Sequence, residues 1–134
     1  NPAHARVLVV DDIDDNRDIL VRRLQRLGVV HIEQAVNGRE ALAAISQREF
    51  DLVLLDVHMP VMDGIDATRV IRQDPLPRVC DVPVLGLTAN VNPLDLAAFK
   101  SAGLSDVMLK PFEPAVLCSK IEQCLLGGSS TRGL

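Results

Sequence analysis

Five polar side chains each stand at the end of a short apolar run of the sequence: Asp11, Asp12, Asp56, Thr88 and Lys110. Three carboxylates that lie close together cannot all stay ionised without a cation. Oxygen ligands without a nearby His or Cys cluster favour a hard ion, which here means Mg²⁺ or alternatively Mn²⁺. A metal ion, a lysine and a hydroxyl around one carboxylate form a site for phosphoryl transfer, in which a carboxylate can be the nucleophile.

Regular alternation of two kinds of segment predicts the elements that would position these side chains. Short apolar runs predict strands at residues 6–10, 31–35, 50–55, 82–87 and 106–109. Helical spacing predicts helices at residues 15–27, 38–48, 64–73, 92–103 and 114–126, the second of them capped by Asn37. This pattern predicts an α/β fold, a doubly wound parallel sheet covered by helices on both faces. Since ligands of such sheets bind at the carboxyl ends of the strands, the five polar side chains should meet there.

Composition limits the classes of function. The chain of 134 residues predicts one domain at 6–126, with a linker at 1–5 and a Gly/Ser-rich tail at 127–134. Three Phe without Trp or Tyr indicate an aliphatic core and no platform for stacking single-stranded nucleic acid. A net charge of −4 argues against a general nucleic-acid or anionic-membrane partner. Three cysteines without a CxxC pair favour a reducing compartment, and no run is long enough for a membrane span, so we expect a cytoplasmic location.

Four motifs resemble those of the receiver domains of two-component response regulators. They are VVDD at residues 9–12, LLDVHMPVMDG at 54–64, LTA at 87–89 and KPF at 110–112. Their order and spacing match the family, and the resemblance covers residues 6–126. It implies a flavodoxin-like fold with five strands in the order 2-1-3-4-5 and five helices.

The resemblance also implies which residues form the metal site. By position, Asp56 is the phosphoacceptor and a metal ligand. Asp12 would ligate Mg²⁺ directly and Asp11 would hold it through water. The main-chain carbonyl of His58 would be a further ligand.

Two residues of the motifs would contact the phosphoryl group. The resemblance implies that Thr88 hydrogen-bonds a phosphoryl oxygen and that Lys110 pairs with the phosphoryl group, oriented by a cis bond to Pro111. One position departs from the family pattern. Val107 occupies the place three residues before the lysine where the family usually has Tyr or Phe, so the usual coupling of threonine to an aromatic ring cannot operate here.

Three further matches narrow the subfamily. DDIDDNR at 11–17, GIDATRVIR at 64–72 and LTAN at 87–90 resemble receivers of hybrid sensor histidine kinases and phosphorelays. The partner is then expected to be a histidine kinase or a His-phosphotransfer domain. The domain would not be a conventional turnover enzyme, although its parent protein could be a histidine kinase. Homodimerisation through the last helices and strand stays open, because Val107 lies on that face.

Two other classes of function remain as alternatives. A docking module would keep the fold and recruit a partner whether or not Asp56 is modified; Val107 favours it and the complete acidic set argues against it. A phosphohydrolase with an aspartyl nucleophile usually has a second Asp two residues later, where this chain has His58. A flavin or dinucleotide site is disfavoured because residues 11–15 are acidic where phosphate needs glycines and amides.

Overall fold

The computed structural model describes residues 5–57, 64–75, 80, 82–88, 93–104, 106–109, 115–116, 119–121 and 123. Its elements follow the predicted alternation: β1 (Arg6–Val10), α1 (Asp14–Arg26), β2 (His31–Ala35), α2 (Gly38–Gln47), β3 (Leu52–Asp56), α3 (Gly64–Arg72), β4 (Val84–Thr88), α5 (Pro93–Ala102) and β5 (Asp106–Leu109). Of the fifth predicted helix, only a few residues are described, and they are helical. The predicted tail and most of the predicted linker lie outside the described residues. Among the described residues, none of the helices has both the length and the hydrophobicity of a membrane span.

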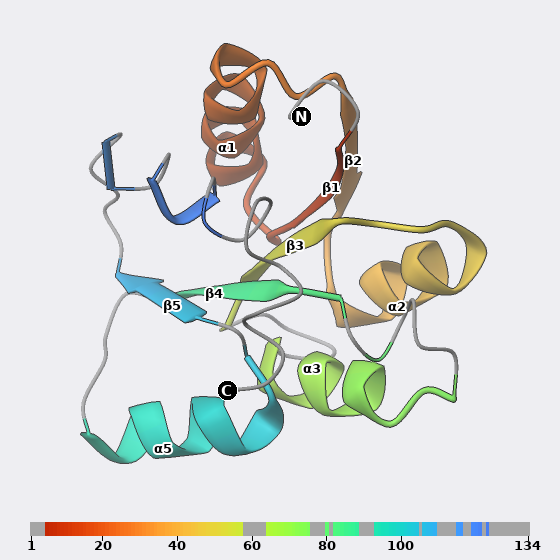
Figure 1. Cartoon of the computed structure of the whole chain (residues 1–134), viewed down its shortest axis with the longest axis vertical. Helices are drawn as coiled ribbons and strands as arrows, with labels where there is room; N and C mark the ends of the chain where they lie inside the picture. The colour runs from red at the N-terminus through yellow and green to blue at the C-terminus, as the bar shows by residue number, and fades with distance from the viewer. Residues whose placement is uncertain are drawn as a thin grey trace.

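The five strands form one parallel sheet in the order β2-β1-β3-β4-β5 (Figure 1), which confirms the predicted order. The predicted bounds of the third and fourth strands were wrong by one or two residues. β3 and β4 begin at Leu52 and Val84 and extend to Asp56 and Thr88. Pro83, which has no N–H to donate, precedes β4, and pairing between the strands continues to their polar last residues. Asp56 and Thr88 are therefore strand residues rather than loop residues.

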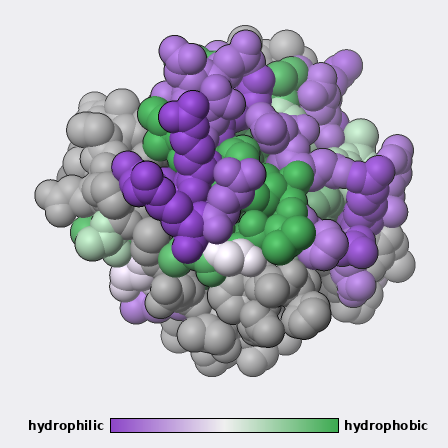
Figure 2. All heavy atoms as spheres, turned by 90° about the horizontal axis from the view of Figure 1, so that it is seen from above, coloured by the Kyte–Doolittle hydropathy of each residue, from purple (hydrophilic) through white to green (hydrophobic). Residues whose placement is uncertain are grey.

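Two apolar cores lie on the two faces of the sheet. One contains Leu20 and Leu24 of α1, packed with Val7, Leu54 and other residues that point to that face. The other joins residues of α2, α3 and α5 to alternate strand residues: Ala41, Ile45, Ala67, Ile71, Phe99, Leu8, Val53 and Leu55. Because both faces are covered, β3 and β4 are buried along their whole length. Figure 2 views the end of the molecule at which α1 lies, where hydrophilic side chains border a smaller hydrophobic area.

Local signals explain where several helices begin and end. The Asn37 side chain accepts a hydrogen bond of 2.9 Å from the main-chain N–H of Glu40, which confirms the predicted cap of α2. Gly28 follows α1 and Gly103 follows α5, with φ of +94° and +103°. A side chain is strained in this left-handed region, so glycine is suited to both helix ends.

Candidate functional site

Three carboxylates meet at the carboxyl edge of the sheet. One side-chain oxygen from each of Asp11, Asp12 and Asp56 lies within 4.8 Å of the others. Asp11 is fully buried and Asp56 is 5% exposed, whereas Asp12 is exposed to solvent. The structure thus brings together the three acidic residues that the sequence predicts for a metal site.

Neighbouring central strands carry these residues to one place. β1 and β3 pair in parallel with Val10 opposite Leu55, so the residues that come next, Asp11 and Asp56, leave the same edge. Asp11 stays tied to the sheet because its N–H donates to the Ala35 carbonyl at 3.2 Å. The acidic cluster is therefore built at the ends of two neighbouring strands, with Asp56 on the central strand β3 and Asp11 directly after β1.

The turn after β1 orients one of the carboxylates. Oδ1 of Asp11 accepts a hydrogen bond of 2.9 Å from the main-chain N–H of Ile13. This bond fixes the side chain of a buried residue and uses one of its oxygens. Asp12, next to it, presents an exposed carboxylate at the same edge. Asp11 is thus buried, with one carboxylate oxygen already accepting a hydrogen bond, whereas the neighbouring Asp12 has a carboxylate exposed to solvent.

Thr88 ends β4, the strand beside β3, and is fully buried. Asp56 pairs with Leu87 in the ladder, and the N–H of Val57 donates to the Leu87 carbonyl at 2.9 Å. Thr88 is therefore the next residue along β4 at the same edge. It pairs with Leu109 of β5, and Lys110 follows in the sequence. Lys110, Pro111 and His58 lie outside the described residues.

The cluster fits a hard divalent cation. All three ligand groups are carboxylates, and Mg²⁺ binds oxygen at about 2.0–2.1 Å, so two oxygens on opposite sides of one ion are about 4 Å apart. A set of oxygens within 4.8 Å of one another suits direct contact by some carboxylates and contact through water by another. The close approach of three negative charges supplies the electrostatic reason to bind a cation.

Gly64 has a role that sequence reasoning missed. The sequence predicts only that the third helix begins there, which is confirmed. The structure adds that a Cβ at this position would lie 2.5 Å from the main-chain oxygen of Asp56 and 2.8 Å from Cα of Val57. The N–H of Gly64 also donates to the Val57 carbonyl at 2.9 Å. The start of α3 therefore packs directly on the backbone that carries Asp56.

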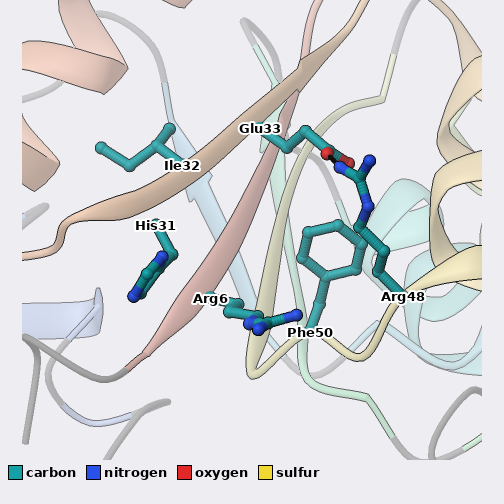
Figure 3. Close-up of a pocket in the computed structure, with 6 residues that line it drawn as sticks. All are labelled: Arg6, His31, Ile32, Glu33, Arg48 and Phe50. Atoms are coloured by element: carbon teal, nitrogen blue, oxygen red, sulfur yellow. Dashed lines mark ion pairs between the residues drawn. The ribbon is translucent and has the colours of Figure 1, made fainter.

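A separate cavity lies at the opposite edge of the sheet, where β1 and β2 begin. It has a volume of about 250 Å³ and is lined by Arg6, His31, Ile32, Glu33, Arg48 and Phe50 (Figure 3). Glu33 and Arg48 point toward each other across it and form an ion pair. None of the predicted site residues lines this cavity, so the cluster of Asp11, Asp12 and Asp56 at the carboxyl edge of the sheet is the candidate site.

Comparison with known proteins agrees with this geometry. Residues 7–122 match the family model "Response regulator receiver domain". The chain is 35% identical over 118 residues to the chemotaxis protein CheY of Pseudomonas aeruginosa, covering 88% of this chain and 94% of that protein.

Longer proteins match over a part of their length. The chain is 36% identical over 125 residues to "Probable transcriptional regulator ycf27" of Cyanidium caldarium and 34% identical over 122 residues to "Sensor protein EvgS" of Escherichia coli. These matches cover 93% and 91% of the chain, which spans 48% and 10% of the two relatives.

A solved structure also matches. The receiver domain of sensor histidine kinase PA1611 from Pseudomonas aeruginosa superposes with a TM-score of 0.80 at 32% identity, covering 92% of this chain and 98% of that one. That structure has a magnesium ion coordinated in its active site cleft.

Proposed function

The chain belongs to the receiver domains of two-component response regulators, and we propose that Asp56 is its phosphoacceptor. One observation carries this proposal. Asp56 is the last residue of the central strand β3 and offers its carboxylate within 4.8 Å of two further carboxylates. An aspartate alone would be a poor nucleophile toward a charged phosphoryl group, whereas one beside a cation site can approach it.

The proposed reaction moves a phosphoryl group from a phosphohistidine to Asp56. The P–N bond breaks and its electron pair leaves with the imidazole nitrogen, while a P–O bond forms to a carboxylate oxygen of Asp56. A bound Mg²⁺ would neutralise part of the negative charge on the phosphoryl oxygens. Mn²⁺, which also accepts oxygen ligands, would serve in its place.

The carboxylates are assigned different parts in holding the cation. Asp12 would be a direct ligand, which its exposed side chain supports. Asp11 would act through water, since its Oδ1 already accepts a hydrogen bond from Ile13 and the residue is fully buried. The main-chain carbonyl of His58 would complete the protein ligands, by resemblance to the family.

Two further residues would contact the transferred group. Thr88, buried at the end of β4 beside β3, would donate a hydrogen bond to a phosphoryl oxygen. Lys110 follows β5, which pairs with β4, and would place its ammonium against the same group. Both assignments rest on the family motifs together with the order of the strands.

The proposed partner is a histidine kinase or a His-phosphotransfer domain. The resemblance of residues 11–17 to receivers of hybrid kinases supports this, as does the match to "Sensor protein EvgS". We place the reaction in the cytoplasm, where phosphohistidine donors form from ATP. A parent protein that is itself a hybrid histidine kinase would place donor and acceptor in one molecule.

The test is phosphorylation by a small phosphodonor. Wild-type protein and Asp56→Asn are incubated with acetyl phosphate and Mg²⁺, and intact masses are measured. The wild type should gain one phosphoryl group, Asp56→Asn should gain none, and a chelator should prevent the gain. No adduct on the wild type, or an equal adduct on Asp56→Asn, would overturn the proposal.

A docking role without phosphorylation is the second candidate, and Val107 favours it. This residue is half-buried on β5 opposite Gly86 of β4, packed against the core beside α5, where the family usually has an aromatic ring. Partner affinity with and without beryllofluoride, a phosphoryl mimic, separates the candidates. Equal affinities would favour docking, and a difference would favour a phosphorylation switch.

A further inference from the structure

Arg17 of α1 is mostly buried although it carries a charge. Its side chain is only 11% exposed, and it makes three polar contacts. Nη1 donates to the main-chain oxygen of Asp11 at 2.7 Å, Nε donates to Oε1 of Gln34 at 3.2 Å, and Nη2 pairs with the carboxylate of Asp14. We infer that Arg17 is a positioning residue for the acidic cation site. This inference rests on the proposed function of that site.

The contacts connect three separate elements. Asp11 follows β1, Gln34 lies in β2 and Asp14 opens α1, so one guanidinium holds the turn between β1 and α1 against the neighbouring strand. A guanidinium suits this task because its donors are fixed in a plane and point in different directions. A flexible ammonium could satisfy one of these acceptors but could not hold all three in this arrangement.

The bond to Asp11 acts on both adjacent carboxylates. The carbonyl of Asp11 and the N–H of Asp12 belong to one planar peptide unit. By holding that carbonyl, Arg17 sets the plane from which the Asp11 and Asp12 side chains extend. The N–H of Asp11 is already held by Ala35 and its Oδ1 by Ile13. Loss of Arg17 would therefore release the carbonyl end of this peptide unit from the hydrogen bond that holds it.

The charge of Arg17 and its positioning role predict opposite effects of its removal on the affinity for Mg²⁺. As a cation beside three carboxylates, Arg17 repels Mg²⁺, so removal of its charge alone would tighten Mg²⁺ binding. As a positioning residue it holds the ligands ready, so its removal would weaken binding. Loss of groups that orient metal ligands typically costs roughly 10–100-fold in metal affinity or activity.

The experiment measures Mg²⁺ affinity by calorimetry for the wild type, Arg17→Gln and Arg22→Gln, each well below its unfolding temperature. Arg22 lies on the same helix and is exposed, so its variant changes net charge equally. Arg17→Gln should bind Mg²⁺ about tenfold more weakly. Arg22→Gln should bind it like the wild type. Arg17→Lys, which keeps the repelling charge but can satisfy only one of the acceptors, should also bind Mg²⁺ more weakly than the wild type.

The dependence of the phosphorylation rate on Mg²⁺ concentration gives a second measurement, which would not change if Arg17 only stabilised the fold. With acetyl phosphate, the Mg²⁺ concentration for half-maximal rate should rise about tenfold in Arg17→Gln. The rate at saturating Mg²⁺ should stay near that of the wild type, because Arg17 is not proposed to contact the phosphoryl group. Unchanged or tighter Mg²⁺ binding by Arg17→Gln would overturn the inference.

A second variant keeps the inference testable if Arg17→Gln does not fold. Gln34→Ala removes the acceptor on β2 and should weaken Mg²⁺ binding severalfold, with Gln25→Ala on the exposed side of α1 as its control. Equal binding by Gln34→Ala and Gln25→Ala would then overturn the role of Arg17. A wild type that neither binds Mg²⁺ nor becomes phosphorylated would instead overturn the proposed function.

Discussion

Gly64, at the start of α3, has no room for a side chain. A Cβ there would lie 2.5 Å from the main-chain oxygen of Asp56, 2.8 Å from Cα of Val57 and 3.2 Å from the main-chain carbon of Asp56. All three neighbours are backbone atoms of a buried strand end, so no rotation of a side chain can relieve the overlap. Gly64→Ala therefore requires α3 and the end of β3 to move apart.

The size of the effect follows from these distances. The shortest one falls roughly 1 Å short of ordinary van der Waals contact. Overpacking of this kind typically costs about 1–3 kcal/mol. Alanine also stabilises by about 0.4–1 kcal/mol because it restricts the unfolded chain. We expect Gly64→Ala to lower the free energy of unfolding by about 1–2 kcal/mol and Tm by roughly 4–8 °C.

Phosphorylation should fall as well, because the displaced backbone carries Asp56. Gly28→Ala is the control: Gly28 has φ of +94° and no atom within 4 Å of the place where a methyl group would lie, so the variant costs about 1–2 kcal/mol of backbone strain away from the site. Unfolding in urea followed by circular dichroism gives both stabilities. Intact mass after incubation with acetyl phosphate and Mg²⁺ gives the extent of phosphorylation of folded protein.

The two variants separate a local effect from general destabilisation. Gly64→Ala should be phosphorylated more slowly than the wild type, and Gly28→Ala at the wild-type rate. If Gly64→Ala is as stable as the wild type and equally reactive, the reasoning from close packing is refuted. If both variants lose phosphorylation equally, the loss follows from stability rather than from the position of Asp56.

Three further predictions concern stability, and chemical denaturation measures each. Asn37→Ala removes the cap of α2 and should cost about 1 kcal/mol; no change would show that the cap bond is not stabilising. Arg72→Met removes donors to the carbonyls of Gly103, Cys80 and Val82 and should cost at least about 2 kcal/mol; a cost below that of Asn37→Ala would contradict it. Mg²⁺ at a hundred times its Kd should raise the free energy of unfolding by about 2.7 kcal/mol, and an equal rise in Asp12→Asn would place the ion elsewhere.

Local patterns in the sequence were sufficient to predict the order of the elements. A continuous apolar run such as residues 52–55 indicates a strand buried on both faces, and α/β alternation then indicates a parallel sheet. The Asn37 cap was also predictable, because the side chain and the N–H that it accepts from are three residues apart. The acidic cluster followed once the strands were placed, because parallel strands present their carboxyl ends at one edge.

Contacts between distant residues could not be predicted in this way. Pairing with a neighbouring strand extends β3 to Asp56 and β4 to Thr88, and the sequence of one strand alone does not show that pairing. The contact of Arg17 with Gln34 depends on how α1 crosses β2, and nothing in the motif DDIDDNR specifies it. The need for glycine at position 64 likewise arises only when α3 is packed on the end of β3.

The burial of β3 constrains any phosphodonor. All five residues of the strand are buried, and Val53, Leu54 and Leu55 pair with both neighbouring strands, so Asp56 ends a strand in the part of the domain that exchanges its amide hydrogens most slowly. Asp56, the proposed acceptor, is therefore held at the sheet edge and does not swing outward to meet a donor. The donor must therefore present its phosphorus on a side chain that projects beyond its own surface and reaches the sheet edge. A flat partner surface, however tightly bound, would leave the two reacting atoms apart.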